Sequence, residues 1–318
     1  MTGMADEHMS KPDFGQDGFF AVQGLSKTFT KKSWFQPASH IHALRNVSLA
    51  LSPGRAMALV GESGSGKSTC AKVMAGIYGP SEGRVVYRGR NLIAGKRRAD
   101  RKVLSSAIQM VFQDPFAALN PAHTIEHHLK RPIRLHGLEQ SGLDQKDRIS
   151  ELLELVQLDP EITRRKYPHE LSGGQRQRIN IARALAVGAE VIIADEPTSM
   201  LDVSIRLDIL KLLKQLKEEK NIALLYITHD IATARYVAEE TAVIYAGQLV
   251  EWGPTAAVID DPQHPYTQLL LAAVPQAGVP FNQSGDRSNG DRVRAAAALD
   301  NDRIIEISPG HFVRDCRI

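Results

Sequence analysis

A short stretch of the chain carries residue types suited to binding phosphate. Gly61 begins the segment GESGSGKST, in which Gly66, Lys67 and Ser68 follow in order. Glycines let successive backbone N–H groups turn toward an anion, a lysine reaches terminal phosphates, and a serine hydroxyl can ligate Mg²⁺. The apolar run 56–60 before it predicts a strand, and the helix expected after it would direct its positive end at the anion. The predicted nucleotide-binding loop consists of Gly61, Glu62, Ser63, Gly64, Ser65, Gly66, Lys67, Ser68 and Thr69.

Two adjacent carboxylates follow a second apolar run, in the segment VIIADEPTSMLD (191–202). A buried strand that ends at Asp195 would present this side chain beside the phosphate loop, where a carboxylate orients Mg²⁺ or its waters. Glu196 comes next and would face the terminal phosphate, where it can polarise an attacking water as a general base. A solvated acidic turn that merely ends a strand is the alternative, but the place of the pair in a chain with a phosphate loop favours the chemical interpretation.

A second glycine-rich helix start lies in YPHELSGGQRQRINIARALA (167–186). Leu171 is followed there by Ser172, Gly173, Gly174 and Gln175, which again have the residue types of an anion-binding helix N-terminus. One nucleotide does not need two such sites in one chain. The second motif therefore calls for an explanation beyond a simple nucleotide-binding loop.

With these motifs the chain resembles the ATP-binding subunits of ABC transporters over about residues 19–275. The resemblance implies a head-to-tail dimer in which LSGGQ of one subunit closes over ATP held by the phosphate loop of the other. It further implies that Gln113 senses Mg²⁺ and the membrane domains, that His229 contacts the γ-phosphate, and that Asp202 belongs to the dimer contact. Mg²⁺ would then be held by Ser68, Gln113 and Asp195. Glu196, His229 and Gln113 would be the catalytic residues.

Two positions depart from the family pattern or leave it open. Met200 stands where alanine is commoner, which would adjust the dimer contact but leaves Asp202 in place. The aromatic ring that stacks on adenine is expected at Phe29, although Trp34 and Phe35 remain alternatives because stacking requires only a flat ring at the right distance.

The order of apolar runs predicts an α/β fold. Strand-like runs at 56–60, 107–112, 190–195, 222–228 and 241–246 alternate with helical patterns, as in a mostly parallel sheet. The resemblance implies an ABC-type P-loop NTPase core (19–260) with an antiparallel β subdomain and a helical subdomain (about 116–185). A short, partly flexible C-terminal extension (261–318) would follow. The polar, glycine- and asparagine-rich stretch 278–301 is interpreted as a loose linker.

The segments DPFAALNP (114–121) and DPQHPYTQLLLAAVP (261–275) resemble the dipeptide, oligopeptide and nickel importers. Membership would imply two transmembrane permease subunits, a second ATP-binding subunit that is a paralogue or an identical chain, and an extracytoplasmic substrate-binding protein. The chain would lie on the cytoplasmic face of the membrane, with its permeases docked on residues 116–165. Peptide is the leading substrate, with oligosaccharide and nickel as alternatives. An exporter ATPase, a non-transport ABC ATPase of DNA repair or translation, and a small-molecule kinase are less favoured interpretations.

Composition and charge indicate which other partners, membrane spans and metal clusters to expect. The net charge of +3 is small and the basic residues are spread along the chain, so a nucleic-acid partner is not expected. No run approaches the roughly 18 apolar residues of a membrane span, and the first residues lack a secretory pattern. Cys70 and Cys316 are the two cysteines and lie far apart in sequence. We therefore expect no iron–sulfur cluster and no zinc.

Overall fold

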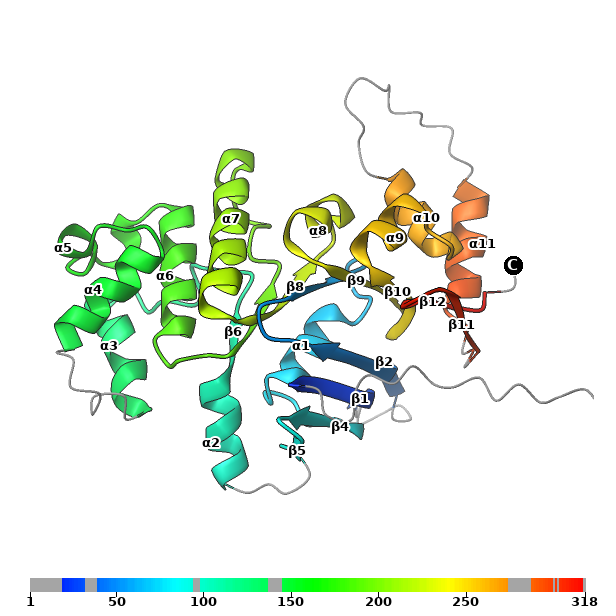
Figure 1. Cartoon of the computed structure of the whole chain (residues 1–318), viewed down its shortest axis with the longest axis horizontal. Coiled ribbons are helices and arrows are strands. Elements are labelled where there is room, and N and C mark those ends of the chain that lie inside the picture. The colour runs from blue at the N-terminus through cyan, green and yellow to red at the C-terminus, as the bar shows by residue number, and fades with distance from the viewer. Residues whose placement is uncertain are drawn as a thin grey trace, which may run out of the picture.

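The computed structural model describes residues 19–31, 39–93, 98–136, 145–273, 287–299, 301 and 303–316. Two β-sheets and the helices around them account for most of these residues (Figure 1). The larger sheet has eight strands in the order β11-β12-β10-β9-β3-β8-β7-β6. Its strands are β3 (Ala56–Val60), β6 (Ile108–Val111), β7 (Val191–Asp195), β8 (Ala223–Thr228), β9 (Glu240–Tyr245), β10 (Gln248–Pro254), β11 (Ile304–Ser308) and β12 (His311–Arg314).

The central strands of this sheet are parallel and buried on both faces. β9, β3, β8, β7 and β6 pair in parallel, whereas β10, β12 and β11 extend the sheet in antiparallel pairs. Successive side chains of a strand point to opposite faces, so Leu224 and Tyr226 join one core while Leu225 and Ile227 join the other. Helices cover both faces, which explains why these strands are apolar throughout rather than alternating.

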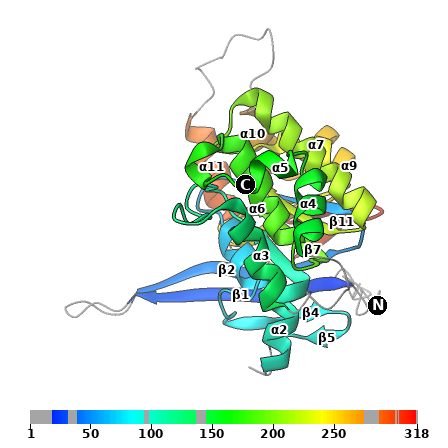
Figure 2. The ribbon, with the colours of Figure 1, turned by 90° about the vertical axis from the view of Figure 1, so that its left-hand side faces the viewer.

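The smaller sheet is antiparallel, with the order β2-β1-β4-β5. Figure 2 shows the long β1–β2 hairpin projecting from the body of the molecule. Helix α1 shares one core with both sheets, and its buried residues Cys70, Val73 and Met74 contribute to it. The elements are β1 (Phe20–Lys31), β2 (Ser39–Leu51), α1 (Lys67–Met74), β4 (Glu82–Tyr87), β5 (Arg90–Asn91) and, beside them in sequence, α2 (Arg98–Ala107).

A group of helices projects from the β6 and β7 edge of the large sheet (Figure 1). Several begin with a side chain that accepts a hydrogen bond from the first turn: Thr124, Asp159 and Ser172 cap their helices in this way. Their apolar faces join the core on that face of the sheet. The helices are α3 (Ile125–Leu135), α4 (Gln145–Leu155), α5 (Pro160–Thr163), the 3₁₀ turn η2 (Pro168–Glu170) and α6 (Gly173–Leu185).

The remaining helices pack over the large sheet and its antiparallel end. They are α7 (Val203–Lys220), α8 (Ile231–Val237), α9 (Thr255–Asp260), α10 (Pro265–Ala272) and α11 (Arg287–Ala297). Buried residues of β9, β10, α9, α10 and α11 form a third, small core that includes Tyr266, Val293 and Ala297. Within the ranges described, no helix combines the length and apolarity that crossing a bilayer requires.

The predicted α/β fold with a mostly parallel sheet and an antiparallel subdomain is confirmed. The strand predicted at 56–60 forms with the same bounds, and the ends of the other predicted strands lie within one residue of their predicted positions. The interpretation of 278–301 as a loose linker is wrong for residues 287–297, which form α11. The four-residue spacing of Val293 and Ala297 places both on the face that packs against the sheet, and this burial outweighs the polar composition of the rest.

Candidate functional site

The predicted nucleotide-binding loop, Gly61–Thr69, is called the phosphate-type loop below. It joins β3 to α1 in a backbone conformation that needs glycine. Gly66 has a φ angle of 111°, and a Cβ atom there would lie 2.6 Å from the carbonyl oxygen of Ala43. A Cβ atom on Gly61 would lie 2.3 Å from the carbonyl oxygen of Ile244. The β9–β10 turn also contacts the loop, because the Gly247 N–H donates to the Ser65 carbonyl oxygen over 2.9 Å. The loop is therefore closely packed by backbone on two sides.

Lys67 is buried within this loop. Its Nζ atom donates to the carbonyl oxygens of Gly61 (2.7 Å) and Glu62 (2.8 Å) and lies 3.9 Å from Glu196 Oε1. Burial lowers the pKa of Lys67, and the charges of Glu196 and Asp195 oppose that shift. The ammonium group is thus already held against the loop, where it can meet an incoming anion.

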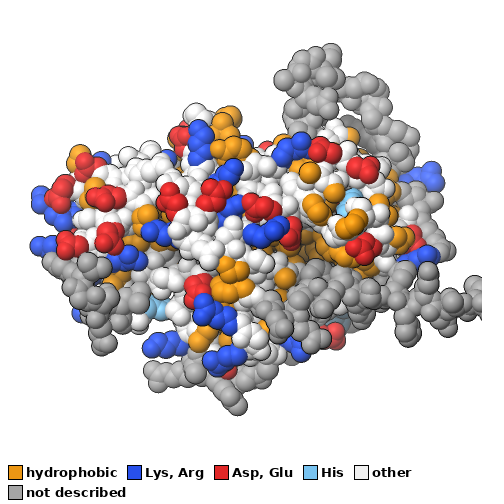
Figure 3. Space-filling model, in the orientation of Figure 1, with side chains coloured by type: hydrophobic (Ala, Val, Ile, Leu, Met, Phe, Trp, Pro, Cys, Tyr) orange, Lys and Arg blue, Asp and Glu red, His pale blue; other side chains and the backbone are white. Residues whose placement is uncertain are grey.

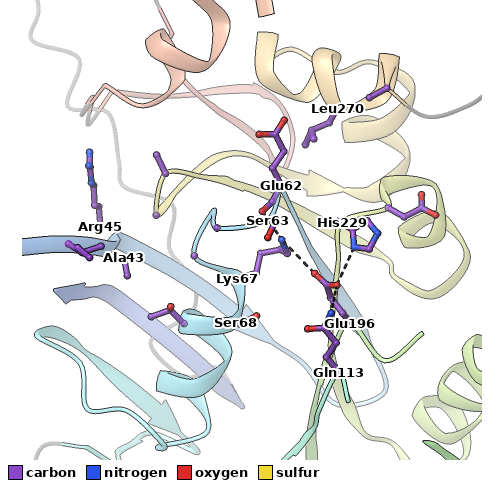
Figure 4. A pocket seen from close by; sticks show the side chains of 18 of the residues that line it. Ala43, Arg45, Glu62, Ser63, Lys67, Ser68, Gln113, Glu196, His229 and Leu270 are labelled. Atoms are coloured by element: carbon purple, nitrogen blue, oxygen red, sulfur yellow. Dashed lines mark hydrogen bonds and ion pairs between the residues drawn. The ribbon is translucent and has the colours of Figure 1, made fainter. Parts of the chain in front are cut away.

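Glu196 occupies the position that the sequence predicts, directly after β7. Its φ angle of 46° places it in the left-handed region, which costs about 1 kcal/mol or more for a residue with a side chain. Its Oε2 atom accepts from Gln113 Nε2 and lies within hydrogen-bond distance of His229 Nδ1, each at 3.2 Å (Figure 4). The structure therefore brings the three predicted catalytic side chains together, around one carboxylate beside Lys67.

Ser68 and Asp195, both predicted to hold Mg²⁺, are in contact. The Ser68 hydroxyl donates to Asp195 Oδ1 over 3.1 Å. Burial raises the pKa of Asp195, with the nearby charge of Glu196 acting in the same direction and the Ser68 hydrogen bond opposing both. A buried carboxylate with a hydroxyl beside it is an oxygen donor set that a hard divalent cation would satisfy, so these residues fit Mg²⁺.

A large open cavity of about 1450 Å³ lies over the loop. Its floor is formed by residues 62–64 and 66–69, and Gln113, Glu196 and His229 line one side. The lining residues that were not predicted include two walls. One comes from β2, with Ile41, His42, Ala43 and Arg45, and the other from α10 and the residue after it, with Leu270 and Ala273. No signal local to these residues could have found them, because β2 reaches the cavity through pairing with β1 and α10 is distant in sequence.

Phe29, the predicted adenine-stacking residue, lies outside the cavity as the described residues outline it. Its ring packs edge-on against Tyr78 with centroids 5.5 Å apart, and Lys27 Nζ lies 5.0 Å from its centroid. The alternatives Trp34 and Phe35 fall outside the described residues. Phe29 as the stacking residue stays a prediction.

The LSGGQ segment caps α6 at a different place on the chain. Ser172 Oγ accepts from the Gln175 N–H, and Gln175 Oε1 accepts from the Ser172 N–H over 3.1 Å, a reciprocal capping box. A Cβ atom on Gly174 would lie 2.5 Å from Ile205 Cγ2, so α6 and α7 approach closely there. Among the described residues that line the cavity, none comes from 172–175. The structure does not bring the two glycine-rich segments together within one chain.

Asp202 precedes α7 with an exposed side chain, which makes no capping hydrogen bond within the described chain. Apolar side chains around it are also exposed: Met200 by 53%, Val203 by 75% and Leu207 by 50%. This surface continues to the cavity, because Val203 also lines it. Exposed apolar side chains that adjoin a site are typical of a contact with another protein surface.

Neither cysteine is among the described residues that line the cavity. Cys70 is buried in α1, where burial raises the pKa of its thiol to about 12, and Cys316 is partly buried. In the part of the chain that the structure describes, no three His, Cys, Asp or Glu side chains gather as a metal site. The expectation of no iron–sulfur cluster and no zinc stays a prediction.

Comparison with known proteins assigns the family. A model described as ABC transporter matches residues 44–199, and a model of the oligopeptide/dipeptide transporter C-terminal region matches residues 250–298. The chain is 39% identical to the oligopeptide transport ATP-binding protein OppF of Bacillus subtilis (strain 168), over 89% of this chain and 93% of OppF. The chain belongs to the ABC transporter ATP-binding proteins. The resemblance drawn from the motifs is confirmed, including its peptide-transporter branch.

Other members of this family show similar agreement. The chain is 46% identical to the glutathione import ATP-binding protein GsiA of Salmonella paratyphi A over 80% of its own length, but it spans 41% of the length of GsiA. The ATP-binding cassette MJ0796, solved as a dimer in a post-hydrolysis state bound to ADP and Pi, superposes with a TM-score of 0.64 at 30% identity, covering 74% of this chain and 98% of that one. This likeness confirms the ABC-type P-loop fold.

Proposed function

We propose that this ABC transporter ATP-binding protein hydrolyses ATP to drive uptake of peptides through partner permeases. The observation that carries the proposal is the arrangement around Glu196: a carboxylate held by Gln113 and His229, 3.9 Å from the Lys67 ammonium at the phosphate-type loop. This arrangement supports a hydrolytic site in which Glu196 would be the general base, with a cation and the loop N–H groups close by.

Each side chain would have a distinct role in hydrolysis. The loop and Lys67 would bind the β- and γ-phosphates, while Ser68 and Asp195, with Gln113 nearby, would hold Mg²⁺, which neutralises phosphate charge when bound. Glu196 would take a proton from the attacking water. Its left-handed backbone conformation and its contacts with Gln113 and His229 would hold the carboxylate where it can take that proton. His229 would also contact the γ-phosphate.

We infer a dimer with two shared sites. The capped N-terminus of α6 lies away from the cavity of its own chain, so Ser172, Gly173, Gly174 and Gln175 would serve the nucleotide of a second chain. The exposed apolar side chains around Asp202 would form part of that interface. The dimer of MJ0796 supports this assembly. The second chain would be a paralogue or an identical copy.

We propose peptides as the transported substrate and two permeases as further partners, with an extracytoplasmic binding protein delivering the peptide. The names of OppF and GsiA support peptides over oligosaccharide or nickel. The permeases would dock on residues 116–165, where a cavity of about 350 Å³ lies against α3 and α6. The chain would therefore lie on the cytoplasmic face of the membrane. Interspersed acidic and basic side chains on the face in Figure 3 give no support to a nucleic-acid partner.

We also propose that the chain divides into an ATPase domain (19–260), with a helical subdomain at about 116–185, and a C-terminal extension (261–318). The two family models, which match residues 44–199 and 250–298 separately, support this division. β11 and β12 nonetheless complete the large sheet, so the extension shares a sheet with the ATPase domain.

Glu196→Gln tests the hydrolytic role. The amide keeps the size of the side chain but cannot accept a proton from water, so we expect ATP hydrolysis to fall about 10²- to 10⁴-fold while ATP binding persists and the dimer accumulates. The matched control is Glu218→Gln, which changes an exposed carboxylate on α7. Normal turnover by Glu196→Gln would refute the assignment of the base.

Substrate class is tested with the whole transporter. ATP hydrolysis would be measured for the chain copurified with its permeases and reconstituted with its binding protein. We expect di- and oligopeptides to stimulate hydrolysis. Stimulation by oligosaccharides or nickel alone would refute the peptide assignment and leave the hydrolytic site as proposed.

A further inference from the structure

The C-terminal segment contacts the phosphate-type loop directly, at Glu62. The Glu62 N–H donates to the hydroxyl of Tyr266 on α10 over 3.1 Å. The guanidinium of Arg294 on α11 donates to Glu62 Oε1 through Nη2 (2.8 Å) and Nε (3.2 Å). Backbone and side chain of one loop residue are thus both held by helices more than 200 positions away in sequence.

Tyr266 is fixed by a buried polar network at the start of α10. The carboxylate of Glu251 on β10 is fully buried and accepts from the N–H groups of Gln263 (2.9 Å) and His264 (3.0 Å) and pairs with His311 Nε2 on β12 (2.8 Å). His264 Nδ1 in turn accepts from the Tyr266 N–H over 3.0 Å. The position of Tyr266 is therefore set by β10, β12 and the turn before α10 rather than by α10 alone.

The position of Arg294 is fixed by the packing of α11. Val293 and Ala297 on the same helix are buried, and Gln248 Nε2 on β10 donates to the carbonyl oxygens of Ala297 (3.1 Å) and Leu299 (2.8 Å) at its end. Arg294 also lies 3.7 Å from Asp291, but that carboxylate is exposed by 81%. The hydrogen bond to Glu62 is the first cause of a raised pKa at Arg294. Glu62 is therefore its main partner.

Glu62 would otherwise place a negative charge at an anion site. Its carbonyl oxygen accepts from Lys67 Nζ, and its charge is among those that oppose the lowered pKa of Lys67. In Figure 4 the Glu62 side chain points away from Lys67, toward the elements of the C-terminal segment. A carboxylate released from Arg294 could turn toward the phosphates, where like charges at short range repel each other.

We propose that Arg294 and Tyr266 are positioning residues for nucleotide binding: Arg294 holds the Glu62 carboxylate away from the phosphates, and Tyr266 fixes the Glu62 amide. The C-terminal segment thereby sets the affinity of the loop for nucleotide. The inference rests on the proposed function, since it assumes that the loop binds ATP.

The experiment measures the dissociation constants of Mg-ADP and of the non-hydrolysable analogue Mg-AMP-PNP by titration calorimetry on the full chain. Arg294→Gln should weaken AMP-PNP about tenfold and ADP less, because the triphosphate carries more negative charge. Arg294→Lys should keep most of the affinity. Tyr266→Phe should weaken both nucleotides by a similar factor, about two- to tenfold, since it removes one neutral hydrogen bond.

Two controls separate positioning from folding. Arg292→Gln changes an exposed arginine of the same helix and should leave both constants unchanged. Glu62→Gln combined with Arg294→Gln should restore the affinity for AMP-PNP, because the released charge is gone. A purely structural role would instead lower the melting temperature of the nucleotide-free variants, and the second substitution would not rescue it.

The outcomes distinguish a failure of the proposed function from a failure of the positioning role. If the unaltered chain binds neither nucleotide, or if Lys67→Ala binds both normally, the proposed function fails and this inference falls with it. If the unaltered chain binds but Arg294→Gln and Tyr266→Phe bind equally well, the positioning role is refuted and the proposed function stands. Equal losses for ADP and AMP-PNP in Arg294→Gln, without rescue by Glu62→Gln, would refute the electrostatic part.

Discussion

His264 makes the stability of the C-terminal segment depend on pH in a calculable way. It is 1% exposed, and its Nδ1 accepts the Tyr266 N–H. Its own backbone N–H donates to the carboxylate of Glu251 on β10, and the charge of Arg314 on β12 acts on its ring. Burial, with the charge of Arg314 in support, lowers the pKa of His264 from 6.5 to about 4. The folded chain therefore resists protonation at a site where the unfolded chain accepts a proton.

The sign and size of the effect follow from this difference. Below pH 6.5 the unfolded chain binds a proton that the folded chain does not, so stability falls as the pH drops toward 4. Each pH unit in that window costs about 1.4 kcal/mol, which amounts to about 2 kcal/mol between pH 7 and 5 and about 3 kcal/mol when complete. His264→Asn should lack this loss, because an amide oxygen can accept the Tyr266 N–H but does not titrate.

Urea unfolding at several pH values would measure the free energy of unfolding of the unaltered chain and of His264→Asn. Subtracting one from the other cancels the titration of the groups that the two proteins share. Trp252 is a suitable fluorescent probe, since it is buried on β10 and stacks against Phe312 of β12 with centroids 5.6 Å apart. Trp34→Phe in both forms would leave it as the single tryptophan. If the difference in unfolding free energy between the unaltered chain and His264→Asn stays constant from about pH 7 to 5, the proposed effect of His264 is refuted.

Three further substitutions test the site. Gly61→Ala should abolish nucleotide binding, because the new Cβ atom would lie 2.3 Å from a backbone oxygen that cannot move aside; Gly79→Ala, which meets nothing within 4 Å, should bind normally in the same titration. Ser172→Ala should lower the free energy of unfolding by about 1 kcal/mol through loss of the helix cap, as read from urea denaturation; an unchanged midpoint would show that the cap contributes nothing. Gly174→Ala should reduce ATP hydrolysis, because the new Cβ atom would lie 2.5 Å from Ile205 Cγ2. Adding Ile205→Ala should restore part of the lost activity. Unchanged ATP hydrolysis by Gly174→Ala would contradict the close packing of α6 and α7.

Motifs that are local in sequence could be predicted from it, and those that depend on distant segments could not. The loop at Gly61–Thr69 and the pair Asp195 and Glu196 each follow one buried strand, so their place at the ends of β3 and β7 follows from the pattern of the chain itself. Gln113 and His229 follow β6 and β8 in the same way. The ends of neighbouring parallel strands lie at one edge of a sheet, and these four segments meet there.

The walls of the cavity and the contacts of Glu62 arise instead from segments that are distant in sequence. Arg294 lies in a stretch whose composition suggests a loose linker, and its helical face becomes visible only through the burial of Val293 and Ala297. Tyr266 reads in sequence as part of a turn that begins a small apolar helix, with no sign of a partner at Glu62. Contacts of this kind depend on how the antiparallel end of the sheet places α10 and α11, which residue spacing does not encode.

The ion pair between Arg294 and Glu62 joins positions 232 residues apart, which has a consequence for how the chain is made. A ribosome adds about 5 to 20 residues per second, so Glu62 waits on the order of 10 to 50 seconds for its partner to be synthesised. Once β8 and β9 have been made, β3, the loop and α1 can pack, but the nascent chain still lacks the helices that restrain Glu62. The phosphate-type loop would thus reach its final form late in biosynthesis, and a ribosome-bound chain stalled before α10 should hold nucleotide more weakly than the released protein.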